Sequence, residues 1–262
     1  MSQLKPISSR SNPLWQRLRK LAQEPTAYRV QGEVWVEGEH LCAEAVQRGQ
    51  TASLAVITEE AWAQARLRQL AEVAPLVLLL PEALMAALSG LGSAPPLALV
   101  LPWSPEQGIE PGAPTVVLDR LQDAGNVGTV LRSAAAFGFR QVIALQGTAA
   151  LWSPKVLRAG MGAHFALHLV EGVAESALST LTVPCLATSS HATHSIDELR
   201  LPWPCAWFMG HEGQGLSPGL QARCQQTLRI PQPGGLESLN VAAAATVCFY
   251  ETARQRAAAA RS

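Results

Sequence analysis

The feature that most constrains the fold is a repeated alternation of short apolar runs and helical segments, interrupted once by a Pro- and Gly-rich stretch. Residues 27–103 and 115–230 each show the alternation, whereas PWSPEQGIEPGAP at 102–114 has no periodic apolar pattern. Strands separated by helices form sheets whose faces the helices cover. The sequence therefore predicts two α/β domains joined by a linker.

The first alternating region predicts strands at 34–36, 54–57, 76–80 and 97–101, with helices at 40–48, after Thr58 and at 81–88. Thr58 is a good N-cap residue, and Gly49 suits the left-handed end of a helix. We expect a basic N-terminal extension at 1–26, a small domain at 27–102, a linker at 103–113 and a second domain at 114–262.

The second region predicts a largely parallel sheet. Its expected strands are 115–118, 141–145, 166–170, 185–188, 206–209 and 226–230, and its expected helices are 126–137, 154–158, 174–181 and 240–260. Ligands of such sheets bind in the loops that follow the carboxyl ends of the strands, so these loops are the place to search for chemistry.

Composition excludes several classes of protein. Hydrophobic residues make up 48% of the chain, charged residues make up 15%, and the formal net charge is zero, which argues against disorder and against a polybasic nucleic-acid coat. Five cysteines without a CxxC pair predict reduced thiols and no metal site. With no apolar run of membrane-spanning length and no signal peptide, we expect a cytoplasmic protein without a membrane partner.

Charge is nevertheless unevenly distributed. Residues 1–30 contain six basic side chains and one acidic side chain, Glu24, and 17 of the 20 basic residues in the chain are Arg. Guanidinium groups suit planar contacts with phosphates and bases. The terminus is therefore either an RNA-contacting segment or a solvated one, and the sequence leaves both readings open.

The first loop with unusual composition is LDRLQDAGNVGTVLRSAAAFGF at 118–139. Asn126 stands where the helix is expected to begin, Gly128 keeps its first turn bare, and Arg132 follows one turn later. A phosphate or ribose could approach the free N–H groups there. The alternative is an N-capping Asn with a surface Arg.

Two more such loops follow. In FMGHEGQGLSP at 208–218, glycines flank Glu212, so backbone and one carboxylate can approach a ligand. Neither the GxxxxGK pattern of a phosphate-binding loop nor a dinucleotide fingerprint is present. The missing fingerprint disfavours a third alternative, a nicotinamide-dependent oxidoreductase on an ordinary doubly wound fold. In RIPQPGGLESLNVAAAATVCFYE at 229–251, Ser238 and Asn240 precede an Ala-rich helix, where they could equally be capping residues.

In this order the three loops resemble the three motifs of the SpoU/TrmH family of RNA ribose 2′-O-methyltransferases, of the SPOUT class. LWSPKVLRAGMGAHFALHLV at 151–170 looks like the segment between the family's first two motifs. EVWVEGEHLCAEAVQRG at 33–49 is similar to the start of the L30e-like substrate domain of many members. The resemblance implies an α/β fold with a deep trefoil knot, S-adenosylmethionine as cofactor, a homodimer formed through the second domain, and structured RNA as substrate, ribosomal RNA ahead of transfer RNA.

The resemblance also implies roles for individual residues. The catalytic positions are Asn126, Arg132, Glu212, Ser238 and Asn240. The cofactor positions are Thr188, Gly210, Gly215, Ile230 and Leu239. Together with the charge pattern, we expect RNA contacts at Arg17, Arg19, Lys20, Arg120 and Arg132.

A guanidinium stays protonated in ordinary protein settings, so Arg132 is better suited to bind a phosphate than to remove a proton as a base. His211 and Gln232 depart from the residues usual in the family, and we expect a structural hydrogen-bonding role for His211. The alternatives are an RNA-binding paralogue without catalysis and a methyltransferase that acts on a base. The intact polar set argues against the first, and SLN at 238–240 argues against the second.

Overall fold

The computed structural model of this chain describes residues 2–105, 108–234 and 238–261. It divides into two compact units, each made of two stretches of sequence. Unit 1 comprises Met1–Pro105 and Trp152–Phe165, and unit 2 comprises Glu106–Leu151 and Ala166–Ser262. The chain therefore passes between the units three times, whereas the sequence predicted one linker at 103–113. Residues 106 and 107 of that linker lie outside the described residues.

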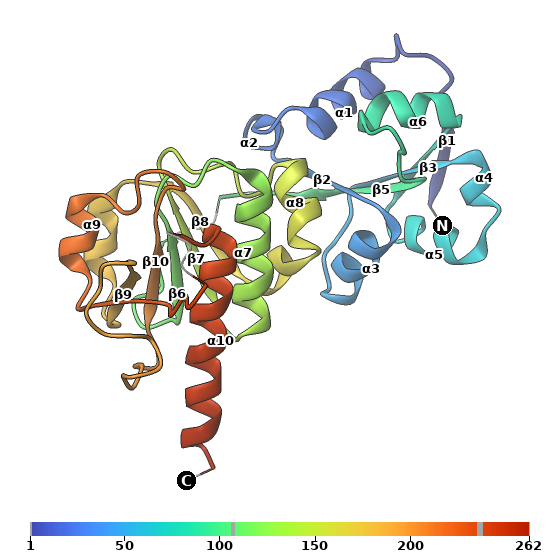
Figure 1. Cartoon of the computed structure of the whole chain (residues 1–262). Helices are drawn as coiled ribbons and strands as arrows, with labels where there is room; N and C mark the ends of the chain where they lie inside the picture. Colours follow the sequence, from blue (N-terminus) through green and yellow to red (C-terminus); the bar gives the residue numbers. More distant parts are fainter. Residues whose placement is uncertain (1, 106–107, 235–237, 262) are drawn as a thin grey trace. The chain divides into compact units, whose positions relative to one another are not determined.

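Unit 1 contains a five-stranded sheet in the order β1-β4-β3-β5-β2 (Figure 1). β5 is antiparallel to both of its neighbours, and the other pairings are parallel. The strands are β1 (Gln3–Pro6), β2 (Glu33–Glu37), β3 (Leu54–Thr58), β4 (Leu76–Leu80) and β5 (Leu97–Pro102). The helices are α1 (Pro13–Gln23), α2 (Ala27–Gln31), α3 (Glu39–Gln47), α4 (Glu59–Trp62), α5 (Ala65–Ala71), α6 (Glu82–Ser89) and α8 (Pro154–Gly160).

The segment predicted as a basic extension, 1–26, forms part of this unit. β1 pairs with β4, and α1 packs against α6. Asn12 caps α1 by accepting a hydrogen bond from the Leu14 N–H at 2.9 Å. Trp15, Leu18 and Leu21 recur at helical spacing on α1 and are buried. The prediction considered only the basic residues of this segment and overlooked the apolar residues at helical spacing. These apolar residues are what pack the helix against the unit.

The segment 152–165, predicted as part of the second domain, groups with unit 1, where α8 packs against β2 and supplies a partner to a buried carboxylate. The Glu37 side chain at the end of β2 is 2% exposed. It accepts hydrogen bonds from Trp35 Nε1 at 3.1 Å, Ser89 Oγ at 2.7 Å and Arg158 Nη1 at 2.6 Å. A buried carboxylate is tolerated only with such partners, so Arg158 fixes α8 to β2.

Unit 2 contains a six-stranded sheet in the order β11-β9-β10-β6-β7-β8, and every pairing is parallel. This confirms the parallel sheet predicted for the second domain. The strands are β6 (Thr115–Leu118), β7 (Gln141–Leu145), β8 (His168–Val173), β9 (Cys185–Thr188), β10 (Ala206–Met209) and β11 (Gln226–Leu228). The order of strands reverses between β6 and β10, which is the position where open parallel sheets bind ligands.

The helices of unit 2 are α7 (Ala124–Ala136), α9 (Pro218–Arg223) and α10 (Val241–Ala259). α7 and α10 lie side by side (Figure 1), joined by a hydrogen bond of 2.8 Å between the hydroxyls of Ser133 and Thr246. The small residues Ala242 and Ala245 are buried on α10, which agrees with the close packing that the Ala-rich run predicted.

Several predicted elements differ in detail. The helix expected at 174–181 is a 3-10 helix, η2 (Glu175–Thr180), and a second 3-10 helix, η1 (Ala163–Ala166), precedes β8, which starts later than expected. β11 ends at Leu228, short of the predicted Ile230. α9 was not predicted, although Ser217 accepts a hydrogen bond from Leu220 N–H and Pro218 occupies the first turn, which is a recognisable helix start.

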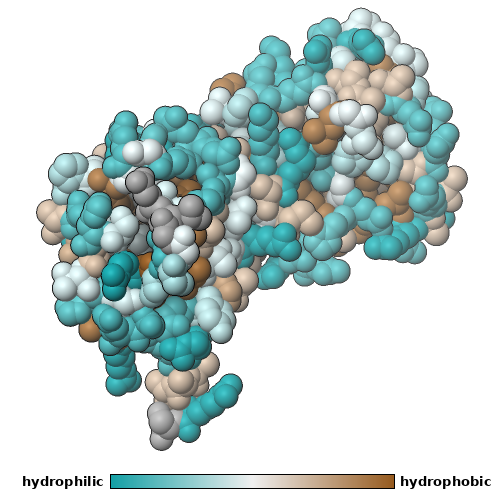
Figure 2. Space-filling model, in the orientation of Figure 1, coloured by the Kyte–Doolittle hydropathy of each residue, from teal (hydrophilic) through white to brown (hydrophobic). Residues whose placement is uncertain are grey.

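Within the described residues, no helix is both long and apolar enough to cross a lipid bilayer. Figure 2 shows mainly hydrophilic side chains over the visible face, with apolar residues in small scattered areas.

The pairing of Glu37 with Arg158 generates a stability prediction. Arg158→Ala removes one partner of a buried carboxylate and is expected to destabilise unit 1 by about 3 kcal/mol. Arg48→Ala breaks an exposed pair with Glu44 and should cost about 0.5 kcal/mol or less. Urea unfolding followed by tryptophan fluorescence measures both, because Trp35 is buried in this unit. Equal losses for the two variants would contradict the prediction.

Candidate functional site

The candidate site lies at the carboxyl edge of the unit 2 sheet. β6 and β10 are neighbours, so the loops that follow Leu118 and Met209 leave the sheet side by side. The third loop, 229–240, connects β11 to α10. The parallel sheet thus delivers all three unusual loops to the same edge.

Asp123, and not Asn126, is the N-cap of α7. The Asp123 side chain accepts a hydrogen bond from the Asn126 N–H at 2.7 Å. The helix therefore begins at Ala124, ahead of the start predicted at Asn126. Because Asp123 meets the capping requirement, the Asn126 amide is free for other contacts. This outcome removes the alternative in which Asn126 is merely a cap.

Three predicted residues, one from each loop, form a chain of hydrogen bonds. Asn240 Nδ2 donates to Asn126 Oδ1 at 2.9 Å, and Asn126 Nδ2 donates to Glu212 Oε1 at 3.3 Å. Asn240 Oδ1 also caps α10, accepting from the N–H groups of Ala242 and Ala243 at 2.9 and 3.2 Å. The orientation of Asn126 is therefore set from both sides, by a helix cap and by a carboxylate.

The surroundings of Glu212 favour its ionised form. Partial burial alone would raise the pKa of this carboxyl, but hydrogen bonds outweigh it and the pKa is lowered from its ordinary value of 4.5. The donors are its own backbone N–H, the Asn126 amide and the N–H groups of Asp123 and Gln122. Glu212 is thus a permanent negative charge near neutral pH, and it acts as an acceptor that orients its neighbours.

The loop around Glu212 is closed tightly on itself. His211 and Gly215 exchange two backbone hydrogen bonds of 3.0 and 2.8 Å. A Cβ placed on Gly210 would lie 2.3 Å from backbone atoms of Gly215 and Leu216, so only glycine fits there. Gly215 has a φ of +68°, a conformation that also favours glycine.

His211 has the structural role predicted for it. Its Nδ1 accepts hydrogen bonds from the Gly213 N–H at 3.0 Å and from the Gln214 N–H at 3.3 Å. The imidazole thereby stabilises the turn that presents Glu212.

Two of the predicted cofactor residues line one cavity of about 600 Å³. Ile230 and Leu239 contribute apolar walls, together with Val247 and Tyr250 of α10. The polar side chains of the lining are Asp197, Gln232 and Glu251. The volume falls within the range of about 300–1,000 Å³ that small-molecule sites occupy. Gln232 Oε1 is buried and has no hydrogen-bond partner within the described residues, so it can accept from a ligand donor.

Of the other predicted cofactor residues, Thr188 and Gly210 lie at neighbouring strand ends, whereas Gly215 closes the turn around Glu212. Thr188 ends β9 and is paired in register with Leu228 of β11, and Gly210 follows β10. Gly235 of the third loop lies outside the described residues, as do the two that follow it.

Arg132 and Ser238 do not join the chain of hydrogen bonds. Arg132 is exposed on α7, and within the described residues its side chain has neither a hydrogen bond nor an ion pair. Ser238 is likewise exposed. Both side chains are free to contact a substrate.

The predicted RNA contacts fall into two groups. Arg17 pairs with Glu33, and Arg120 pairs with Asp119, so a phosphate would have to compete with a carboxylate for either guanidinium. Arg19 and Lys20 are exposed on α1, and they line a hollow of about 530 Å³ together with Arg10.

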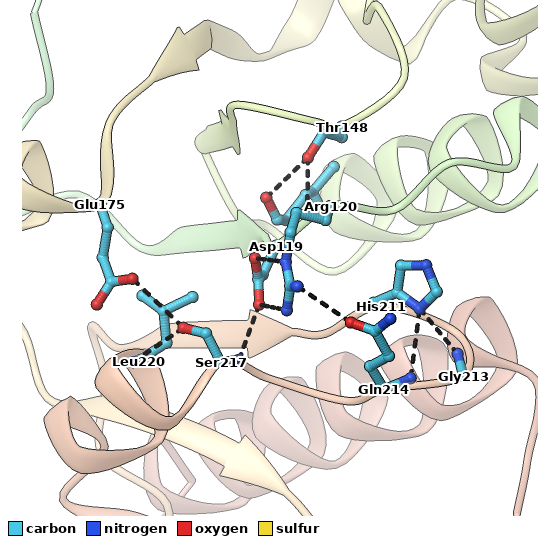
Figure 3. A network of polar contacts seen from close by, with 10 residues as sticks. Asp119, Arg120, Thr148, Glu175, His211, Gly213, Gln214, Ser217 and Leu220 are labelled. Carbon is cyan, nitrogen blue, oxygen red and sulfur yellow. Dashed lines mark hydrogen bonds and ion pairs between the residues drawn. The ribbon is translucent and has the colours of Figure 1, made fainter.

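Sequence reasoning missed Asp119, which lies at the centre of a polar network between the first two loops (Figure 3). Its side chain is 5% exposed and binds Arg120, and it also accepts a hydrogen bond from Ser217 N–H at 3.0 Å. An aspartate directly after an apolar strand was the available signal, because a carboxylate that follows buried residues must find donors.

The comparisons with known proteins agree with this arrangement. The model of the SpoU rRNA Methylase family matches residues 113–250. An uncharacterized tRNA/rRNA methyltransferase of Synechocystis is 33% identical over 98% of this chain and 97% of that protein. The 23S rRNA (guanosine-2′-O-)-methyltransferase RlmB of Bordetella pertussis is 36% identical over 56% of this chain and 62% of its own length. The crystal structure of an AdoMet-bound rRNA methyltransferase from Sinorhizobium meliloti covers 97% of this chain and is itself covered to 98%, with a TM-score of 0.83 and 25% identity.

The close approach at Gly210 generates a prediction. Gly210→Ala is expected to displace the 211–216 turn, and amide hydrogen exchange in that turn should accelerate about tenfold or more. Gly213→Ala is the matched control, because its Cβ would lie 3.9 Å from the nearest atom and its backbone needs no left-handed conformation. If amide exchange in the 211–216 turn stays slow in Gly210→Ala, the close contact between residue 210 and the backbone of Gly215 and Leu216 does not require glycine.

The hydrogen bonds to Glu212 generate a pH prediction. Because its pKa in the folded chain lies below 4.5, its stabilising contribution is present above that value and is lost as the pH falls through the folded pKa. In Asn126→Ala one donor is lost, so the pKa of Glu212 should rise. Thr129→Ala changes a hydroxyl bonded to Gly125 O on the same helix and should leave it unchanged. NMR titration of the carboxyl carbon measures the midpoints, and identical midpoints in all three proteins would refute the assignment.

Proposed function

Because the chain belongs to the SpoU rRNA methylase family, we propose that it transfers the methyl group of S-adenosylmethionine to a ribose 2′-hydroxyl of ribosomal RNA. The structural observation that carries the proposal is the hydrogen-bonded chain of Asn240, Asn126 and Glu212, which joins one side chain from each of three loops. The Bordetella relative is named as a ribose 2′-O-methyltransferase of 23S rRNA, and the Sinorhizobium structure is described as AdoMet-bound.

The residues present fit this cofactor. S-adenosylmethionine supplies an electrophilic methyl group on a sulfonium, and its amino and hydroxyl groups are hydrogen-bond donors. Gln232 Oε1, which is buried and has no hydrogen-bond partner within the described residues, offers an acceptor beside the apolar walls of Ile230 and Leu239. The backbones of Thr188, Gly210 and Gly215 would complete the site.

In the reaction, the ribose oxygen forms a bond to the methyl carbon while the carbon–sulfur bond breaks, and the hydroxyl proton passes to solvent. The protein must align the hydroxyl with the methyl group and stabilise negative charge that grows on the oxygen. Asn126, held from both sides, and the exposed Ser238 hydroxyl are suited to fix the ribose. Glu212 orients Asn126 and does not act as the base, because its lowered pKa makes it a weak proton acceptor.

Arg132 is proposed to bind the phosphate next to the target ribose and to stabilise the developing alkoxide. Its guanidinium has no carboxylate partner within the described residues, in contrast to Arg120. A guanidinium forms two parallel hydrogen bonds to phosphate, which fixes position as well as charge.

The N-terminal unit is proposed to bind structured RNA away from the reacting ribose. Arg19 and Lys20 are exposed on α1, and the Arg19 guanidinium lies 5.9 Å from the Trp15 ring centre, which favours an ordered side chain. Such contacts read the shape and backbone of folded RNA. An enzyme that modifies ribosomal RNA works where ribosomes are assembled, so we also propose a cytoplasmic location.

The family resemblance further supports two proposals about architecture. We propose that the end of the chain forms a deep trefoil knot around the cofactor site, and that two copies pair through unit 2. The pairing is supported by large apolar side chains left exposed near and on α10, with Val247 at 37% and Tyr250 at 53% exposure.

The proposed pairing predicts an effect of charge on α10. Val247→Asp places a carboxylate in the expected interface and should shift the protein from dimer to monomer, whereas Arg261→Asp, beyond the helix, should not. Sedimentation equilibrium measures both. A monomeric wild-type protein would exclude the pairing.

The test of the function is methyl transfer from labelled S-adenosylmethionine into separated ribosomal and transfer RNA. Alkali-resistant labelled dinucleotides in ribosomal RNA are expected, because a methylated 2′-oxygen cannot attack the adjacent phosphate. Labelled bases would indicate a base methyltransferase. Label in transfer RNA alone would show that the substrate is transfer RNA and not ribosomal RNA. RNA binding without transfer of label would indicate a non-catalytic RNA-binding protein.

The role of Arg132 is tested by Arg132→Lys, which keeps the charge and removes the planar fork. We expect kcat/KM for RNA to fall by about 10- to 100-fold, the range that loss of a charge-assisted contact gives. The affinity for S-adenosylmethionine should stay unchanged. Arg140→Lys, another exposed arginine of unit 2, is the control. Full turnover with unchanged RNA affinity in Arg132→Lys would exclude a bidentate role.

A further inference from the structure

The turn that follows β6 contains an ion pair between adjacent residues, Asp119 and Arg120. Arg120 Nε donates to Asp119 Oδ1 at 2.8 Å, and Arg120 Nη2 donates to Asp119 Oδ2 at 3.0 Å. Asp119 is buried, with 3% of the residue exposed. Two parallel charge-assisted bonds to a buried carboxylate define the position of the guanidinium far better than an exposed pair does.

The backbone of Arg120 is held in a conformation that arginine rarely adopts. Its φ is +57°, in the left-handed region. The Arg120 N–H donates to Thr148 Oγ1 at 3.1 Å, and that hydroxyl donates to Leu118 O at 3.0 Å. A Cβ on Gly147 would lie 3.2 Å from Arg120 Cγ, so the loop after β7 also shapes this position. A disfavoured backbone persists where its surroundings determine it, and such positions concentrate at functional sites.

The pair reaches the Glu212 loop at two points (Figure 3). Asp119 Oδ2 accepts from the Ser217 N–H at 3.0 Å, where the loop ends and α9 begins. Arg120 Nη1 donates to Gln214 Oε1 at 3.2 Å, near the tip of the loop. Glu212 is two residues from Gln214, and its carboxylate bonds to Asn126. Asp119 and Arg120 thus connect the loop after β6 to the loop after β10 through contacts separate from the Asn126–Glu212 bond.

We propose that Asp119 and Arg120 are positioning residues that clamp the 210–217 loop, so that Gly210 and Glu212 are held in place for the cofactor and for Asn126. The inference rests on the proposed function for the identity of the cofactor. It gives Arg120 a role different from the RNA contact that its charge predicts, because Nε, Nη1 and Nη2 all have acceptors within the protein.

Two variants separate the clamp from other roles. Arg120→Asn removes the guanidinium and keeps a residue that tolerates the left-handed backbone. Gln214→Ala removes only the contact near the tip and leaves the Asp119–Arg120 pair in place, so folding of the core is not at risk. Gln214→Glu retains an acceptor for the guanidinium and is the conservative rescue. Arg140→Asn, an exposed arginine outside the network, is the matched control.

The readouts are equilibrium dialysis of S-adenosylmethionine without RNA, hydrogen exchange of residues 211–216, and kcat and KM for RNA. In Arg120→Asn we expect about tenfold weaker cofactor binding and about tenfold faster exchange, with KM for RNA nearly unchanged. Gln214→Ala should weaken cofactor binding and accelerate hydrogen exchange of residues 211–216 by about threefold each, and Gln214→Glu should restore both to the wild-type values.

Unchanged cofactor affinity and exchange in both Arg120→Asn and Gln214→Ala would overturn the clamp. A raised KM for RNA in Arg120→Asn as the sole effect would also overturn it and assign the guanidinium to RNA. If the wild-type protein binds S-adenosylmethionine but methylates no RNA, the proposed function fails, while dialysis and hydrogen exchange still decide the clamp.

Discussion

The parallel arrangement of the unit 2 sheet is the constraint on which the site depends. All of its strand pairings are parallel, so every strand of this sheet ends at the same edge. Because β6 and β10 are neighbours although some ninety residues separate them, loops distant in sequence meet there. An antiparallel pairing of these two strands would send the Asn126 and Glu212 loops to opposite ends of the sheet. The parallel direction of these strands is therefore the first requirement for bringing the site side chains together.

At this edge of the sheet, the site depends on different residues capping α7 and contacting the other site side chains. Asp123 satisfies the first turn of α7, which leaves both ends of the Asn126 amide for Asn240 and Glu212. Asn240 performs both tasks at once, since its oxygen caps α10 while its nitrogen bonds to Asn126. The placement of Asn126 is thus tied to the start of two helices that pack together. A small shift of either helix would therefore move the Asn126 amide.

Most strands and the meeting of the three loops could be predicted from the sequence, because apolar periodicity and the rule for parallel sheets depend on local pattern alone. The cap at Asp123 could not be separated from Asn126, since both residues are good N-caps three positions apart. The partners of Arg17 and Arg120 were invisible for another reason. A charge count does not show which carboxylate lies within reach. Glu33 comes near Arg17 only after β2 and α1 have packed together, and the neighbouring Asp119 pairs with Arg120 through the turn that follows β6. The same holds for α8, whose grouping with unit 1 depends on a glutamate more than a hundred residues earlier.

The order of the two stretches of unit 1 along the chain constrains when this unit can complete its folding during synthesis. Unit 1 consists of an N-terminal stretch and a short insert, 152–165, which lies between strands of unit 2. The N-terminal stretch alone would leave the buried Glu37 without its arginine partner. Unit 1 can therefore make this contact only after residue 158 has been synthesised, when β6 and β7 of unit 2 are already part of the chain. The order of the segments along the chain thus makes the completion of unit 1 a later step of synthesis than its N-terminal position would indicate.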